Sequence, residues 1–140
     1  MSTPLEHYKA GMTAYANGDN ATAVALFQQA VDAKPGWTDA MNALATAHMH
    51  NGDLDQAIAV GQAVAELDKE DPFIHTSLSI FYQRKSAGFE AAGNEAEAKR
   101  FIKLAEEEGA KARLLSWKIE LKTNPNAPPP GPADGMRVIE

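Results

Sequence analysis

The stretch from Gly11 to Pro35 reads GMTAYANGDNATAVALFQQAVDAKP, and variants of it return from Ala45 and from Ser79. The copies share a glycine, a polar residue after it and an alanine four positions further on: Gly18-Asp19 with Ala23, Gly52-Asp53 with Ala57, and Gly93-Asn94 with Ala98. The second copy follows the first by 34 residues and the third follows the second by 41, so the third carries seven extra residues. Self-similarity at such a period indicates an array of helical hairpins that stack on one another.

Composition narrows the possible classes of protein. The chain has 140 residues, 44% of them hydrophobic and 23% charged, which is typical of a globular domain with a modest core. A net charge of -6 argues against a nucleic-acid-binding face. Without cysteine there are no disulfides or thiolate metal sites. No apolar run resembles a signal peptide or a membrane span, and we expect a cytoplasmic protein.

Helix-start signals divide the chain into pairs of helices. Thr3, Pro4 and Glu6 predict a first helix that begins with a capping box, and a second helix is expected from Ala21 to about Ala33. The expected caps of the next three helices are Thr38, Asp53 in a box with Gln56, and Asp71 before Pro72. The connections are too short for anything but antiparallel neighbours.

The sequence allows two alternatives both for the extra residues of the third hairpin and for the end of the last helix. The seven extra residues fall near Gln83–Glu90, where a longer helix is favoured over a disordered insert, since seven residues are close to two helical turns. Asn94 and Glu97 predict the start of the last helix, which could end at Gly109 or continue to about Lys122. Continuation is slightly favoured, with a Glu107–Lys111 pair partly offsetting the cost of a helical glycine. Either way, residues 110–122 would cover the end of the array.

From Asn124 onward proline and glycine dominate, and the sequence predicts an extended, polyproline-like tail. We therefore expect a helical domain over residues 1–122 and a tail over residues 123–140. The tail ends in an apolar segment. This segment is either a frayed terminus or a docking segment that packs on its own domain or on a partner. Its candidate docking residues are Met136, Val138 and Ile139.

The repeats resemble the tetratricopeptide-repeat family over residues 4 to about 122. The first copy carries the family's small, aromatic and proline positions: Gly11, Gly18, Ala23, Phe27, Ala30 and Pro35. It departs from the family at His7 and Ala14, where a tryptophan and a tyrosine are usual. The resemblance implies an all-α helical solenoid: three antiparallel helix pairs with an extended third hairpin, a capping helix and a proline-rich tail.

In this family the first helices of successive pairs line a concave groove that binds another protein. Carried over to this sequence, the groove positions are Leu5, Tyr8, Met12 and Tyr15 in the first pair, Asp39, Asn42, Thr46 and Met49 in the second, and Phe73, Thr76, Ile80 and Gln83 in the third. Such a groove suits an amphipathic helix or an extended peptide. Any one of these residues is as easily a packing residue.

Some family members clamp the terminal carboxylate of chaperone peptides with cationic side chains. The corresponding places here hold Tyr8, Met12, Ala43, Phe73 and Ser77, none of them cationic, so a carboxylate clamp is not expected.

The sequence contains little that indicates a metal, cofactor or catalytic site. His48 and His50 lie two residues apart and would point to different sides of a helix, so no metal site is expected from that pair. His7 and His75 fall where the family packs a tryptophan, which favours a structural role. No phosphate loop, nucleophile elbow or HExxH motif occurs, and we expect neither a cofactor nor catalysis.

The sequence therefore predicts a non-catalytic adaptor or scaffold that binds a helix or peptide of a partner protein. The alternative is a structural or self-assembling subunit that is tethered to its own copies or to a larger complex through its C-terminal tail. Neither hypothesis identifies the partner.

Overall fold

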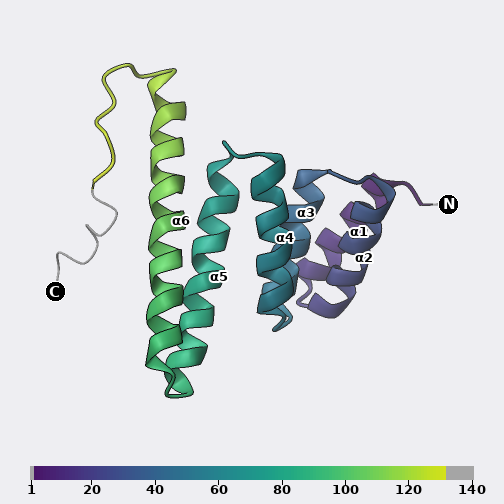
Figure 1. Cartoon of the computed structure of the whole chain (residues 1–140). Coiled ribbons are helices and arrows are strands. Elements are labelled where there is room, and N and C mark those ends of the chain that lie inside the picture. The colour runs from purple at the N-terminus through teal and green to yellow at the C-terminus, as the bar shows by residue number, and fades with distance from the viewer. Residues whose placement is uncertain (1, 132–140) are drawn as a thin grey trace. The chain divides into compact units, whose positions relative to one another are not determined.

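The computed structural model describes residues 2–131, and the described chain is entirely helical apart from its connections and its tail. The helices are α1 (Pro4–Ala16), α2 (Asn20–Ala33), α3 (Thr38–His50), α4 (Leu54–Leu67), α5 (Pro72–Ala91) and α6 (Glu95–Leu121). They belong to two compact units that divide between residues 69 and 70. Helices α1–α4 form the first unit, and the α5–α6 hairpin with the chain after it forms the second (Figure 1). This all-helical architecture confirms the predicted solenoid fold of tetratricopeptide-repeat type.

The same turn closes all three hairpins. Gly18, Gly52 and Gly93 have φ angles of 79°, 86° and 82°, in the left-handed region that glycine adopts without a steric penalty. In each turn the residue after the glycine donates its N–H to a carbonyl five residues back; the first is Asp19 to Ala14, at 2.9 Å. The glycine itself bonds three residues back. This is the Schellman arrangement, which satisfies the last carbonyls of a helix. The repeated glycine and polar residue of the sequence therefore encode one turn, used three times.

Most of the predicted helix caps are confirmed. Thr3 and Glu6 exchange two hydrogen bonds of 3.1 Å in the expected capping box. These bonds, above all the one from the Thr3 backbone, lower the pKa of Glu6. Asp71 accepts a bond from Phe73 N at 2.9 Å, and Asn94 accepts one from Glu97 N at 3.2 Å.

One predicted cap, Thr38, is wrong, and Asp53 occupies the predicted cap position without the expected side-chain bond. The residue that precedes α3 is Trp37, without a side-chain cap bond, and Thr38 is the first helical residue. Asp53 precedes α4 as expected, but its side chain makes no cap bond. Its carboxylate instead accepts from Asn51 Nδ2 at 3.2 Å and lies 3.7 Å from His48 Nδ1. The Asp53 carboxylate therefore bonds the Asn51 side chain and does not cap α4.

The core of the first unit forms where each helix packs on the next. Its central cluster of buried residues consists of Ala23, Phe27, Leu44 and Ala47, surrounded by half-buried tyrosines, valines and alanines. Gly11 is buried against Phe27, and a Cβ atom on Gly11 would meet the Phe27 ring at 2.6 Å. Helices α1 and α2 can approach this closely because α1 contributes only a glycine where the Phe27 ring of α2 packs.

Polar bonds between α5 and α6 hold the second unit in register. Buried Ser79 donates to the Ala105 carbonyl at 2.8 Å, and buried Ser86 donates to the Ala98 carbonyl at 2.7 Å. Seven residues forward along α5 thus correspond to seven residues back along α6, as an antiparallel pair requires. One turn before Ser79, the Nδ1 atom of His75 lies 2.7 Å from Glu108 Oε1. His75 is buried and has a structural role, as expected.

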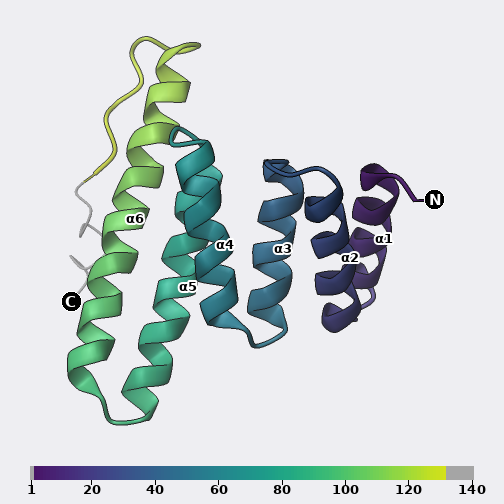
Figure 2. The same cartoon turned by 45° about the vertical axis from the view of Figure 1, so that its right-hand side comes forward.

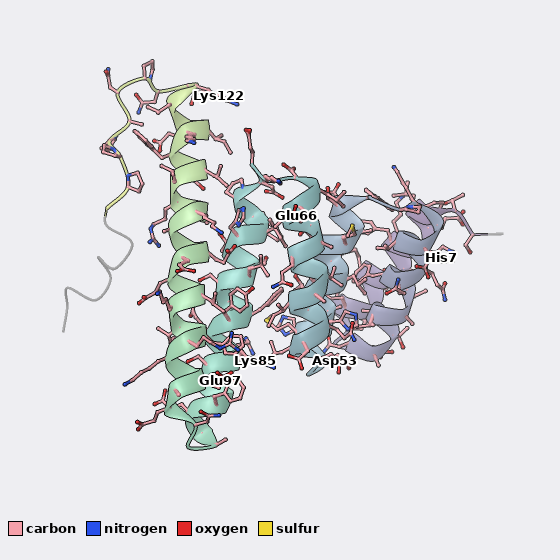
Figure 3. The ribbon with its side chains drawn as sticks, viewed as in Figure 1. His7, Asp53, Glu66, Lys85, Glu97 and Lys122 are labelled. Carbon is pink, nitrogen blue, oxygen red and sulfur yellow. The ribbon has the colours of Figure 1, made fainter. Side chains whose placement is uncertain are left out.

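The extra residues of the third repeat lengthen its hairpin. Helix α5 has 20 residues, whereas α1 and α3 have 13 each, so the favoured longer helix is confirmed. Aromatic packing continues into the extension, with Phe89 stacked on Phe101 at a centroid distance of 5.6 Å. Figure 3 shows Lys85 and Glu97 near one another at this end of the hairpin. Hydrogen bonds from Arg100 and, to a smaller extent, the charge of Lys85 lower the pKa of Glu97.

Helix α6 passes through Gly109 without a break, as the slightly favoured alternative predicted. The covering segment expected at residues 110–122 is therefore the end of α6 and not a separate helix. The expected Glu107–Lys111 pair is wrong, because Lys111 Nζ bonds Glu108 Oε2 at 3.0 Å instead. Glu108 thus contacts both His75 and Lys111, and these contacts on either side of Gly109 offset the roughly 1 kcal/mol cost of a helical glycine.

Replacing Gly11 with alanine should destabilise the first unit by about 1–2 kcal/mol. The clash with Phe27 outweighs the roughly 1 kcal/mol gain in helix propensity. Gly88→Ala is the matched control, since that helical position is exposed and open, and it should gain about 0.5–1 kcal/mol. Urea unfolding followed by circular dichroism measures both. Equal stability of Gly11→Ala and the wild type would contradict the tight packing.

Replacing Glu108 with alanine should destabilise the α5–α6 hairpin by about 1–3 kcal/mol, because buried His75 loses its carboxylate partner. The neighbouring Glu107 is exposed, so Glu107→Ala should change the unfolding free energy by less than about 0.5 kcal/mol. Thermal unfolding of the two variants side by side tests the assignment. Equal losses in both would show that the His75 contact contributes nothing.

Candidate protein-binding surface

The predicted groove positions form one stripe on each first helix. On α1 these are Leu5, Tyr8, Met12 and Tyr15, spaced by three, four and three residues, which places them on one side of the helix. The corresponding residues of α3 and α5 follow at intervals of 34, with the same spacing. None of the twelve positions is fully buried. The stripes on α1 and α3 belong to the first unit, and the stripe on α5 belongs to the second.

The stripes of α1 and α3 lie next to each other. Tyr8 contacts Trp37, at the start of α3, with a centroid distance of 5.1 Å, and Tyr15 contacts His50, at its end, at 5.5 Å. Both tyrosines are half-buried. Because the two contacts occur at opposite ends of the helices, α1 and α3 run side by side in the same direction. This pair of stripes, with Trp37 and His50 at its ends, is called the α1–α3 surface below.

Two large apolar side chains of the α1–α3 surface are open to solvent. Leu5 is 50% exposed and Met12 is 44% exposed, and they alternate with the two tyrosines along α1. Tyr8 also packs on the buried Phe27 ring at 5.8 Å, which fixes its orientation. The surface therefore combines rigid aromatic groups with exposed apolar ones, the composition that protein interfaces favour at their centres.

Helix α3 supplies the polar part of this surface. Asp39 is exposed, and Asn42, Thr46 and Met49 are half-buried. The Thr46 hydroxyl donates to the Asn42 carbonyl at 3.1 Å, so its donor is already used. The side-chain oxygen Oδ1 of Asn42 is buried and has no hydrogen-bond partner. A buried acceptor without a partner costs about 1–3 kcal/mol.

The stripe on α5 has a similar character. Phe73 is 56% exposed and Ile80 is 41% exposed, seven residues apart on the same side of the helix. The polar residues between and after them bond within α5: Thr76 donates to the Pro72 carbonyl at 3.1 Å, and Gln83 donates to Ser79 Oγ at 3.2 Å. The exposed part of this stripe is therefore mainly apolar.

Sequence reasoning missed two members of the α1–α3 surface. Trp37 is not among the predicted groove positions, but its ring contacts groove residue Tyr8 and lies 4.9 Å from Lys34 Nζ. His50 was considered only as a metal ligand, whereas its ring packs on Tyr15. An aromatic residue just before a first helix and another at its end were the available signals, since these positions meet the neighbouring repeat.

Other expectations stand as follows. The docking residues proposed for the tail, Met136, Val138 and Ile139, lie outside the described residues. Within residues 2–131 there is no group of three or more His, Asp or Glu side chains that could hold a metal ion. His7, placed on the first helix, is half-buried (Figure 3). No helix of the described part combines the length and apolar character needed to cross a membrane.

Comparisons with known proteins agree with this architecture. A sequence model of the tetratricopeptide repeat matches residues 8–72, which include most of α1, all of α2–α4 and every residue of the α1–α3 surface except Leu5. No curated protein matches the sequence.

Seventeen chains of solved structures match the fold. One of them, from a structure of the CopN-Scc3 complex, has a TM-score of 0.58 and 19% sequence identity, covering 89% of this chain and 69% of that chain. At this identity the likeness concerns the fold, and it extends well beyond residues 8–72. Residues 8–72, with two helix pairs, therefore match the tetratricopeptide-repeat family in sequence, and the third hairpin repeats their turn within a fold that is shared over most of the chain.

Proposed function

We propose that this protein is a non-catalytic adaptor of the cytoplasm that binds a helix or an extended segment of another protein along the α1–α3 surface. The observation that carries the proposal is the alternation of exposed and anchored side chains on α1. Leu5 and Met12 are about half exposed, and Tyr8 and Tyr15 between them are held in place by contacts with α3. A chain of similar fold occurs in the CopN-Scc3 complex, which supports a role in binding another protein.

The exposed apolar groups supply a moderate driving force. Complete burial of a leucine or methionine side chain contributes about 1.5–3 kcal/mol, and the exposed halves of Leu5 and Met12 can contribute about half of that each. Tyr8 and Tyr15 add contact area at low entropic cost, because packing against Trp37 and His50 has already restricted them. A partner with apolar residues at helical spacing would match both groups.

Asn42 gives the surface a means of fixing the direction of a bound segment. Its unpartnered oxygen lies between the aromatic ends of the α1–α3 surface, since Trp37 precedes it and His50 follows it on α3. A rotation of the side chain toward a bound peptide would pair this oxygen with a peptide N–H group. Binding would then remove the cost of the unsatisfied acceptor, whereas an apolar patch alone would not prefer one orientation.

We further propose that a partner also contacts the stripe on α5. Phe73 and Ile80 are exposed in the same pattern as Leu5 and Met12, at positions 68 residues later in the repeat. A segment bound along this stripe would bury both apolar groups. No catalytic step is part of this proposal.

Met12→Asp should abolish partner binding, because it places a charge at the centre of the apolar stripe. Leu67→Asp is the matched control: Leu67 is 57% exposed, lies in the same unit and is outside the surface. The tagged variants are expressed in the protein's own host, and co-purifying proteins are quantified by mass spectrometry. At least one partner retained by the wild type and by Leu67→Asp should fall about tenfold with Met12→Asp. Equal capture of every partner by all three proteins would refute the proposal.

Ile80→Asp in the same experiment tests the contribution of α5. At least one partner captured by the wild type should fall about tenfold with Ile80→Asp, because the substitution places a charge on the apolar stripe of α5. Loss with Met12→Asp alone would limit the interface to the first unit and refute the contact with α5.

Asn42→Leu should separate stability from binding. Leucine removes the buried unsatisfied acceptor, so the unfolding free energy should stay constant or rise by up to about 1 kcal/mol. Capture of the partner should nevertheless weaken about fivefold or more, because one peptide N–H group loses its acceptor. Thermal unfolding and titration with the captured partner give the two values. Unchanged affinity would exclude Asn42 from the interface.

A further inference from the structure

The chain after α6 reverses its direction through a set of backbone hydrogen bonds. Asn124 N donates to the Glu120 carbonyl at 2.8 Å, and Ala127 N donates to the Asn124 carbonyl at 3.0 Å. Asn126 N adds a bond of 3.3 Å to Asn124 Oδ1. Figures 1 and 2 both show the segment beyond this turn running back alongside α6. Residues 127–131 of this segment, APPPG, are called the strap below.

A hydrogen bond to Trp117 fixes the strap on α6. The indole Nε1 donates to the Ala127 carbonyl at 3.0 Å. Ala127 is only 6% exposed, although it belongs to a segment without regular secondary structure. Three residues further on, Pro130 is half-buried, whereas Pro128, Pro129 and Gly131 are exposed.

This burial pattern has the period of a polyproline II helix, which has three residues per turn. One edge of the strap, containing Ala127 and Pro130, is covered, and its other edges face solvent. Such a helix forms no internal hydrogen bonds, so all its carbonyl oxygens are free to accept. An indole N–H is a donor only, and the ring beside it offers an apolar face. Trp117 thus supplies what an extended proline-rich segment lacks.

The face of α6 around Trp117 continues beyond that single contact. Leu114 and Leu121 lie three residues before and four residues after Trp117, so the three side chains form one stripe. Leu121 is half-buried, and Leu114 is still 43% exposed with the strap in place. An aromatic hydrogen-bond donor within an apolar stripe is the arrangement by which proteins recognise polyproline segments.

We propose that the Trp117 face of α6 is a binding site for extended proline-rich segments, occupied in this chain by its own strap. The strap is connected to α6 by only a few residues, and a short linker gives it an effective concentration on the order of millimolar. A segment from another molecule therefore binds only when it outcompetes the strap or when the strap is released. This site is independent of the α1–α3 surface, and either can exist without the other.

The test uses the full-length chain with Trp37→Phe, which leaves Trp117 as the sole tryptophan. Into this parent we introduce Ala127→Glu, which places a charge on the covered edge of the strap, or Pro128→Glu, which places the same charge on its free edge. Fluorescence emission and acrylamide quenching report the exposure of Trp117. Ala127→Glu should shift the emission to the red and increase quenching about twofold, and Pro128→Glu should resemble the parent. Both positions lie outside the helices, so far-ultraviolet circular dichroism should be unchanged.

The second arm adds the synthetic peptide NPNAPPPGP, the sequence of residues 124–132, to each protein. It should reverse the spectral change of Ala127→Glu at submillimolar concentration, and it should bind the parent at least about tenfold more weakly because the strap competes. The same peptide with glutamate at the position of Ala127 is the negative control and should have no effect.

Two results would overturn the proposal. One is a Trp117 spectrum that is the same in Ala127→Glu and in the parent, which would mean that the strap does not cover the residue. The other is a released Trp117 that ignores the peptide up to several millimolar, which would mean that the contact is a local feature of the turn. Light scattering of the parent then distinguishes the sources of a bound segment. A dimer that Ala127→Glu dissociates would show that the strap of a second copy occupies the site.

Discussion

The first unit depends on the close approach of its helices, which small residues permit. Gly11 lies directly against the Phe27 ring, and Ala23, Ala30, Ala40 and Ala47 are buried almost completely. With so little side-chain volume between the helix axes, Phe27 and Leu44 are the only large members of the buried cluster. The large side chains of the α1 stripe are exposed or only partly buried. The exposed apolar groups of the α1–α3 surface are therefore a consequence of how the core is packed.

The second unit solves the problem of a longer hairpin with directed bonds. Apolar contacts alone would tolerate a shift of α5 along α6, since both helices are rich in small residues. Ser79, Ser86 and His75 remove that freedom, because each has a single well-placed acceptor on α6. A shift by one turn would break all three of these contacts between the helices, and lost hydrogen bonds of buried groups cost about 1–3 kcal/mol each. The register of the hairpin is therefore set by these polar contacts and its stability mainly by aromatic packing.

Much of this architecture could be predicted from the sequence, and the failures have a common cause. The turns, the long third hairpin and the continuity of α6 all depend on neighbours in sequence, and local patterns identify them. The errors concern choices between nearby partners. Asp53 takes Asn51 in place of a cap bond, and Lys111 takes Glu108 in place of Glu107. In each pair the alternatives differ by a few tenths of a kilocalorie per mole, which tertiary contacts easily reverse.

The candidate surfaces also contain some features that the sequence predicts and others that depend on tertiary contacts. The stripes on α1 and α3 were predicted by the resemblance to the tetratricopeptide-repeat family, and their spacing of three and four residues places them on one side of each helix. The resemblance could not identify Trp37 and His50 as part of that surface, since their roles depend on the contact between repeats. The strap is a sharper case. The proline-rich composition indicated an extended segment. It does not reveal that a tryptophan ten residues earlier donates a hydrogen bond to one of the carbonyls of this segment.

The two surfaces differ in what happens when a ligand is absent. On the α1–α3 surface the tyrosines stay in place through ring contacts, so the surface remains formed and its exposed leucine and methionine stay in water. On α6 the indole donor would be half-buried beside an apolar stripe, and the chain itself covers it. A strap with prolines at three of its five positions loses little conformational entropy on docking, because proline already restricts the free chain. A weak contact is then sufficient to keep Trp117 covered, and a contact of that strength is also one that a competing proline-rich segment can displace.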